Sequence, residues 1–121
     1  MGYESRMFVV NKSDSLYENK DGKSRRWAEI IAIFNMSCLG DVGRKFRNYP
    51  ATDCYINNAD DEVIADCYGD ALKEIPLADA INIITEAAAN ENYRRFVPFL
   101  GLLNGFDPSE WSNLVVLHYG Y

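Results

Sequence analysis

The residues best suited to catalysis are a single histidine and three cysteines. His118 stands in an apolar run at residues 114–119, and Cys38, Cys54 and Cys67 are widely spaced along the chain. A nucleophilic thiol must meet the imidazole and a third group that orients the imidazole, and no local signature around any cysteine predicts this arrangement. The spacing also predicts neither a disulfide framework nor a zinc site, although one disulfide between two of the cysteines stays an alternative. We therefore expect no catalytic residue and no enzymatic activity.

Acidic residues between positions 60 and 70 raise a second kind of chemistry, the binding of a divalent cation. An EF-hand loop needs a glycine at its sixth position and a glutamate at its twelfth. Counted from Asp60, these two positions hold Ala65 and Leu72. The segment 40–43 (Gly-Asp-Val-Gly) likewise lacks the Lys-Ser/Thr pair of a phosphate-binding loop. The sequence therefore predicts no metal site and no cofactor.

Charge is distributed unevenly along the chain, whose formal net charge is -6. Residues 1–52 carry nine Lys/Arg against six Asp/Glu, residues 53–91 carry one against ten, and residues 92–121 carry two against two. A strongly acidic segment repels nucleic acid and attracts basic surfaces. It is either a solubilising face or a surface that binds a basic protein, and in the second case the tyrosines serve as anchors. The candidate partner contacts are Asp53, Tyr55, Asp60, Asp61, Glu62, Asp66, Tyr68 and Asp70.

Composition and length indicate one ordinary globular domain over residues 1–121. Of these residues, 48% are hydrophobic and 25% are charged, which is typical of a chain that folds around its own core. No apolar stretch approaches the roughly 20 residues that span a bilayer. The first residues also lack a basic leader followed by an apolar core. We therefore expect a cytoplasmic protein with no membrane partner.

The longest nearly unbroken apolar run covers residues 27–36 (Trp-Ala-Glu-Ile-Ile-Ala-Ile-Phe-Asn-Met) and predicts a buried central strand. Its β-branched and aromatic side chains favour a sheet over a helix. Alternation divides the apolar side chains between two covered faces, with Trp27, Ile31 and Ile33 on one and Ala28, Ile30, Ala32, Phe34 and Met36 on the other. Four further strands are expected at residues 3–12, 53–56, 62–68 and 114–119, the first of them beside the central strand.

Two helices are expected before the last strand. Pro76 fits a first helical turn, and the apolar residues from 77 to 88 follow helical spacing. Residues 92–103 predict a second helix that Pro98 kinks or delays. Residues 37–50 are expected to form a loop or one short helical turn, and residues 71–75 an extended segment or loop. The predicted fold class is α+β, a single domain with a mainly antiparallel sheet of about five strands and two helices inserted before the last strand.

Three segments carry a resemblance to a group of known proteins. These are residues 2–10 (Gly-Tyr-Glu-Ser-Arg-Met-Phe-Val-Val), 28–34 (Ala-Glu-Ile-Ile-Ala-Ile-Phe) and 114–121 (Leu-Val-Val-Leu-His-Tyr-Gly-Tyr). They resemble small uncharacterised proteins encoded by phages and prophages of Gram-positive bacteria. The resemblance implies a bacterial host cytoplasm, and a context in which small acidic proteins inhibit host defence systems, anti-CRISPR proteins among them.

Three functions are therefore weighed. The first is a phage-type binding protein that inhibits a host nucleic-acid-handling or defence protein through its acidic surface, without binding nucleic acid directly. The alternative is a homo-oligomeric structural or accessory protein, such as a homodimer joined through strand edges or an apolar helix face. A hydrolase that uses His118 with a cysteine or a carboxylate ranks last. The first hypothesis loses most of its force if the acidic and basic segments pair within one monomer.

Overall fold

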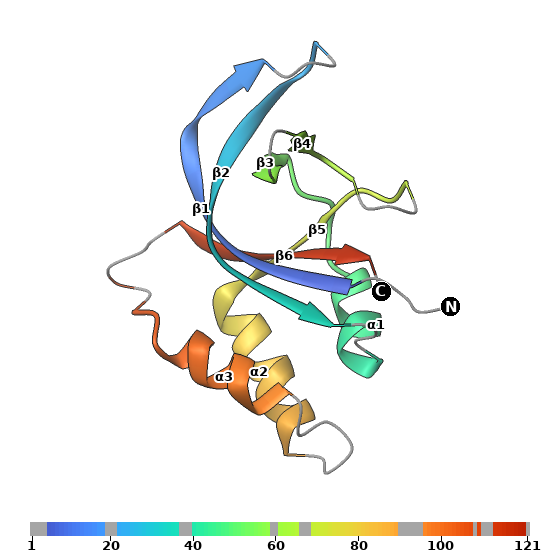
Figure 1. The fold of residues 1–121 in the computed structure, drawn as a ribbon, viewed down its shortest axis with the longest axis vertical. Helices are drawn as coiled ribbons and strands as arrows, with labels where there is room; N and C mark the ends of the chain where they lie inside the picture. The colour runs from blue at the N-terminus through green and yellow to red at the C-terminus, as the bar shows by residue number, and fades with distance from the viewer. Residues whose placement is uncertain are drawn as a thin grey trace.

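A long, curved hairpin of two strands, β1 (Ser5–Glu18) and β2 (Ser24–Met36), dominates the computed structural model (Figure 1). The structure describes residues 5–18, 22–36, 40–58, 61–65, 69–89, 96–107, 109 and 113–120. β1 and β2 pair antiparallel along their whole length, as expected for neighbouring strands. The expected end of the first strand at residue 12 is wrong, because pairing with β2 keeps the chain extended as far as Glu18.

The sheet formed by the described residues has six strands in the order β4-β3-β2-β1-β6-β5. Its neighbours are antiparallel except β2 and β3, which pair in parallel at two positions only, Arg26 with Cys54 and Trp27 with Tyr55. The sheet and the three helices described below confirm the predicted α+β class and the small single domain, with one strand and one helix more than expected. The remaining strands are β3 (Cys54–Asn58), β4 (Asp61–Val63), β5 (Lys73–Pro76) and β6 (Leu114–Gly120).

Apolar side chains fill both faces of the central strands. Met7 and Val9 of β1 face the helices, whereas Phe8 and Val10 face the concave side of the hairpin, where they meet Ile56 and other residues around β3. All four of these β1 side chains are buried, while Trp27 and Ile33 of β2 are exposed. The prediction of a buried central strand at residues 27–36 is therefore right about its position in the sheet and wrong about its burial.

β2 carries a bulge that changes which side chains share a face. Val9 pairs with Ala32 and Val10 with Ile30, so Ile31 is an extra residue on β2. One extra residue shifts the alternation of side chains by one position. The expectation that Ala28 and Ile30 share a face with Ala32 and Phe34 is therefore wrong. Ala28 and Ile30 pack on the concave side, and Ala32 and Phe34 pack on the helix side.

Helices α2 (Leu77–Ala88) and α3 (Val97–Asn104) lie side by side beneath the sheet (Figure 1). α2 buries an apolar stripe at helical spacing, which confirms the predicted helix. Pro76 does not lie in its first turn, because it is the last residue of β5 and the N-cap residue of α2, with an extended ψ of 141°. In α3, Pro98 stands in the first turn, where the missing N–H costs no hydrogen bond. The predicted start at residue 92 lies outside the described residues. Phe99 packs against Phe34 of β2, with ring centroids 4.6 Å apart, and so joins α3 to the sheet.

The segment expected to be a loop or one short turn contains a two-turn helix, α1 (Asp41–Arg47). Val42 and Phe46, one turn apart, are both buried against the helix side of the sheet. Tertiary packing of this stripe outweighs the weak helix signal of a segment that contains two glycines. No helix among the described residues is long and apolar enough to cross a membrane.

Candidate functional site

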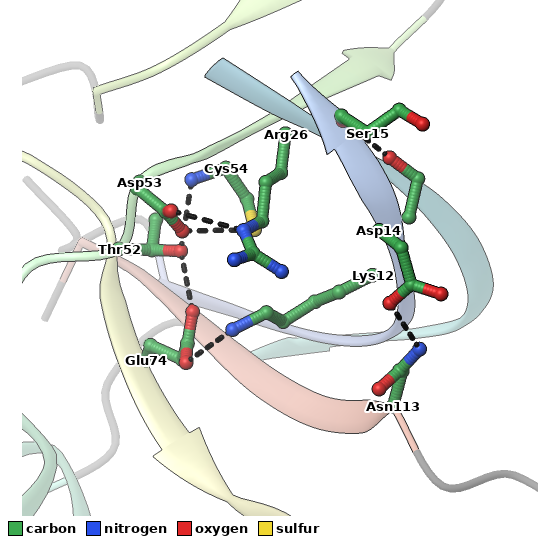
Figure 2. Close-up of polar contacts among 10 residues, drawn as sticks. Lys12, Asp14, Ser15, Arg26, Thr52, Asp53, Cys54, Glu74 and Asn113 are labelled. Atoms are coloured by element: carbon green, nitrogen blue, oxygen red, sulfur yellow. Dashed lines mark hydrogen bonds and ion pairs between the residues drawn. The ribbon is translucent and has the colours of Figure 1, made fainter.

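Polar side chains cross the concave side of the curved hairpin and connect it to β3 and β5 (Figure 2). Lys12 of β1 places its Nζ 2.9 Å from Oε2 of Glu74 in β5. Arg26 of β2 places its Nε 3.2 Å from Oδ2 of Asp53, and its backbone N–H donates to the Asp53 carbonyl at 3.2 Å. Asp53, a predicted partner contact, is therefore paired within the monomer. The two ion pairs hold the hairpin against the strands that it encloses.

Asp53, Cys54 and Glu74 each place a potential metal-ligating atom within 4.8 Å of the others. Two facts argue that this group is structural. Burial, above all, raises the pKa of the Cys54 thiol, which keeps the thiol protonated, and both carboxylates already contact cations. To bind here, a divalent metal ion would have to displace the Lys12 and Arg26 side chains from the carboxylates and deprotonate a buried thiol. Thr52 completes the network, since its Oγ1 donates to Glu74 at 2.7 Å and accepts the Cys54 N–H at 3.1 Å.

Pairing within the monomer also involves acidic residues of α2. Lys45 of α1 lies 3.4 Å from Glu86, and the Tyr49 hydroxyl donates to Oδ2 of Asp79 at 3.0 Å. Together with Asp53 and Glu74, two further members of the acidic segment 53–91 thus have partners in the same chain. Three of these carboxylates, on Asp53, Glu74 and Glu86, lie beside a cation of the same chain, so the field of the segment is weaker than its sequence count implies.

Aromatic side chains from three neighbouring strands surround an open hollow of about 280 Å³. We call it the aromatic hollow, and the described residues that line it are Tyr17 of β1, Trp27 of β2, and Tyr55 and Asn57 of β3. Trp27 and Tyr55 are register partners, so their side chains lie on the same face. The side chains of Tyr17 and Trp27 remain 49% and 38% exposed. This end of the hairpin extends away from the helices (Figure 1), and neither α2 nor α3 lines the hollow.

The predicted contact residues divide into several groups. Tyr55 lies in the aromatic hollow, whereas Asp53 belongs to the polar network. Asp70 lines a different hollow, together with His118. Asp61 and Glu62 belong to β4, paired in register with Asn58 and Asn57 of β3, so the strands expected at 53–56 and 62–68 form a hairpin whose second strand ends at Val63. Asp60, Asp66 and Tyr68 lie outside the described residues.

His118 and Cys54 lie on opposite faces of the sheet. His118 is buried on the helix side, where its ring meets the edge of Phe46 at a centroid distance of 5.6 Å. Cys54 is buried on the concave side, beside Phe8 and Ile56. A nucleophilic pair of these two residues is therefore ruled out. Cys38 and Cys67 lie outside the described residues.

Trp27 and Tyr17 are the functional candidates that the sequence analysis missed. The apolar pattern of residues 27–36 predicts that Trp27 is buried, and Tyr17 lies beyond residue 12, where the first strand is predicted to end. One signal was available, because Trp27 follows Lys23, Ser24, Arg25 and Arg26, a polar run that is unusual for the entry of a fully buried strand. The pairing of Trp27 with Tyr55 has no counterpart in local sequence.

No protein-family model, curated protein or solved structure significantly matches this chain.

Proposed function

We propose that this protein is a non-enzymatic binding protein that holds another protein, one with a basic surface, at the aromatic hollow. One observation carries the proposal: three aromatic side chains from three adjacent strands gather around an open hollow that the helices leave uncovered. Tyrosine and tryptophan are enriched at protein interfaces because they bury a large apolar area at a small cost in side-chain entropy. The aromatic hollow is thus the primary contact surface.

The acidic residues favour a basic partner, but they contribute less to binding than their number in the sequence suggests. Residues 53–70, which include the β3–β4 hairpin beside the hollow, contain six acidic residues and no lysine or arginine. Asp53 pairs with Arg26 and Asp70 lines a different hollow, so Asp60, Asp61, Glu62 and Asp66 supply most of the attraction. Such charges raise the rate of association and choose the partner more than they determine affinity. The aromatic side chains therefore supply most of the binding energy, and the carboxylates contribute mainly to the rate of association.

The class of partner follows from the resemblance to phage and prophage proteins. It is a nucleic-acid-handling or defence protein of the bacterial host, which the present protein would inhibit. Occupation of a nucleic-acid-binding surface on the partner is the expected mode of inhibition, since such surfaces are basic.

The experiment compares variants during capture from host lysate with an N-terminal tag. Trp27→Ala and Tyr17→Ala are expected to lose a protein that the wild type retains. Leu102→Ala, which removes a similarly exposed side chain from α3, is the matched control and is expected to retain it. With the purified partner, Trp27→Ala should raise Kd by about tenfold or more. Added salt should slow association of the wild type. Equal affinity of Trp27→Ala and wild type for every captured protein would refute the proposal.

A second candidate, self-association, is favoured by the open edge of β2. Beyond Trp27, no described strand pairs with the side of β2 that faces away from β1, and Ile33 is exposed on this segment. Unpaired strand edges can join two copies of a chain. Light scattering over a range of protein concentrations tests this candidate. A mass that rises with concentration, and falls back to the monomer in Ile33→Lys, would support it over binding to a different protein.

A further inference from the structure

A second hollow of about 280 Å³ lies at the end of the sheet beside α1, on the helix side. We call it the His118 pocket, and the described residues that line it are Arg47, Asp70, Ala71, Lys73, His118 and Gly120. It shares no described residue with the aromatic hollow. Binding at this pocket can therefore be tested independently of the proposed function.

Three nitrogen-bearing side chains from three different elements meet at this pocket. Lys73 of β5 and His118 of β6 are register partners, so both side chains leave the sheet on the same face. Phe46 of α1 packs its buried ring against the imidazole and restricts its orientation. Arg47, the next residue and the last of α1, also lines the pocket. The sheet thus fixes Lys73 and His118 relative to each other, and the end of α1 brings Arg47 to the same pocket.

A fourth polar group lies next to the pocket. Ser5 of β1 is directly opposite Gly120 in the sheet, and Gly120 lines the pocket without a side chain of its own. Ser5 is fully buried, and its Oγ has no hydrogen-bond partner among the described residues. A buried hydroxyl is costly to leave unpaired. A ligand or ordered water held in this region would satisfy it.

We infer that the His118 pocket binds a small phosphorylated molecule, with the phosphate between Arg47 and Lys73. A guanidinium group can hold two phosphate oxygens at once and a lysine adds a point charge, and the imidazole of His118 lines the same pocket. The volume of about 280 Å³ lies just below the usual range for ligand pockets, which excludes large cofactors.

Asp70 refines the ligand class. Its carboxylate also lines the pocket, and a carboxylate repels a bare phosphate but accepts hydrogen bonds from hydroxyl groups. With one carboxylate against two permanent cations, the pocket favours a ligand that carries both a phosphate and a hydroxyl group. A compound of the size of glycerol phosphate combines the two. Asp70, taken from sequence as a partner contact, is thus assigned to the His118 pocket instead.

The test uses the imidazole of His118 as a reporter, because it is the only histidine of the chain and gives one unambiguous pair of ring signals in NMR spectra. Glycerol phosphate, inorganic phosphate, sodium acetate and glycerol are added separately at constant pH and ionic strength. A saturable shift with glycerol phosphate, tighter than with inorganic phosphate or acetate, is the expected result. Glycerol alone should cause no shift. A shift that never saturates with either phosphate would overturn the inference, and so would equal or tighter binding of acetate.

Variants then locate the binding. Arg47→Gln and Lys73→Gln are each expected to raise Kd for glycerol phosphate by about tenfold. Arg44→Gln is the matched control, since Arg44 is an exposed arginine on the same helix and does not line the pocket. Asp70→Asn should tighten binding of inorganic phosphate. Unchanged affinity in both Arg47→Gln and Lys73→Gln, with the folded spectrum retained, would overturn the inference. Arg47 is exposed at the end of its helix, so its variant tests the inference even if Lys73→Gln unfolds.

Discussion

The ion pair between Lys12 and Glu74 offers the sharpest test of how the curved hairpin is held. Its side chains are only 20% and 23% exposed, and Nζ lies 2.9 Å from Oε2. Glu74→Gln removes the charge but keeps an oxygen for Thr52, which leaves Lys12 half-buried without its counter-ion. Exposed pairs contribute about 0–1 kcal/mol, and breaking fully buried pairs costs about 3–5 kcal/mol. For this intermediate burial we expect Glu74→Gln to lower the free energy of unfolding by about 2 kcal/mol.

A double-mutant cycle in urea measures the interaction itself. Lys12→Met and Glu74→Gln, singly and together, should give a coupling energy of about 1–2 kcal/mol. At about 3–5 °C per kcal/mol for a domain of this size, Glu74→Gln should also lower Tm by about 6–10 °C. The control cycle uses Lys45 and Glu86, which are 3.4 Å apart and 49% and 76% exposed, and should give at most about 0.5 kcal/mol. Equal coupling in both cycles would show that burial of the Lys12 pair has no energetic effect.

Three further predictions test the core, the backbone and the response to alkali. Phe99→Ala should cost about 3–5 kcal/mol of stability in urea, because it empties a fully buried site, whereas Leu102→Ala on the exposed face of the same helix should cost well under half of that. Gly22 has a φ of +79°, so Gly22→Ala should lower the free energy of unfolding by about 1 kcal/mol. Gly101→Ala, which has open space around the new Cβ, should raise the free energy of unfolding by about 0.5–1 kcal/mol. Burial and a hydrogen bond to a carboxylate raise the pKa of Tyr49 above 10.0, so the folded state keeps this proton longer than the unfolded chain, and stability should fall as pH rises above 10. Tyr49→Phe should reduce that alkaline slope in urea titrations, and an unchanged slope would contradict the assignment.

Elements defined by local pattern were predictable from sequence. α2 combines a proline just before its start with a regular apolar stripe, and β6 is a short apolar run with two adjacent valines that follows Ser112 and Asn113. The bulge at Ile31 was not predictable, because every neighbouring residue is apolar and no glycine or polar residue marks the extra position. α1 was underestimated for a related reason, since its helix depends on burial of Phe46 against a strand more than 60 residues later.

The candidate sites depend even more on contacts between distant segments. The sequence predicted Tyr55 as an anchor, and this residue lies in the aromatic hollow. Its neighbours Trp27 and Tyr17 could not be assigned with it, because a parallel pairing only two residues long leaves no periodic trace. The sequence shows an acidic segment at residues 53–91. The field of this segment also depends on Lys12, Arg26 and Lys45, which come from the first part of the chain and form ion pairs with it.

The place of β6 between β1 and β5 also has a consequence for synthesis on the ribosome. The β1–β2 hairpin emerges early, but the other edge of β1 must wait for residues 114–120 before its backbone groups are paired. During that interval a strand with four consecutive buried apolar residues, Met7 to Val10, presents an open edge to other nascent chains. β1 is therefore among the last strands to be fully paired, and the risk of aggregation is greatest just before translation reaches β6.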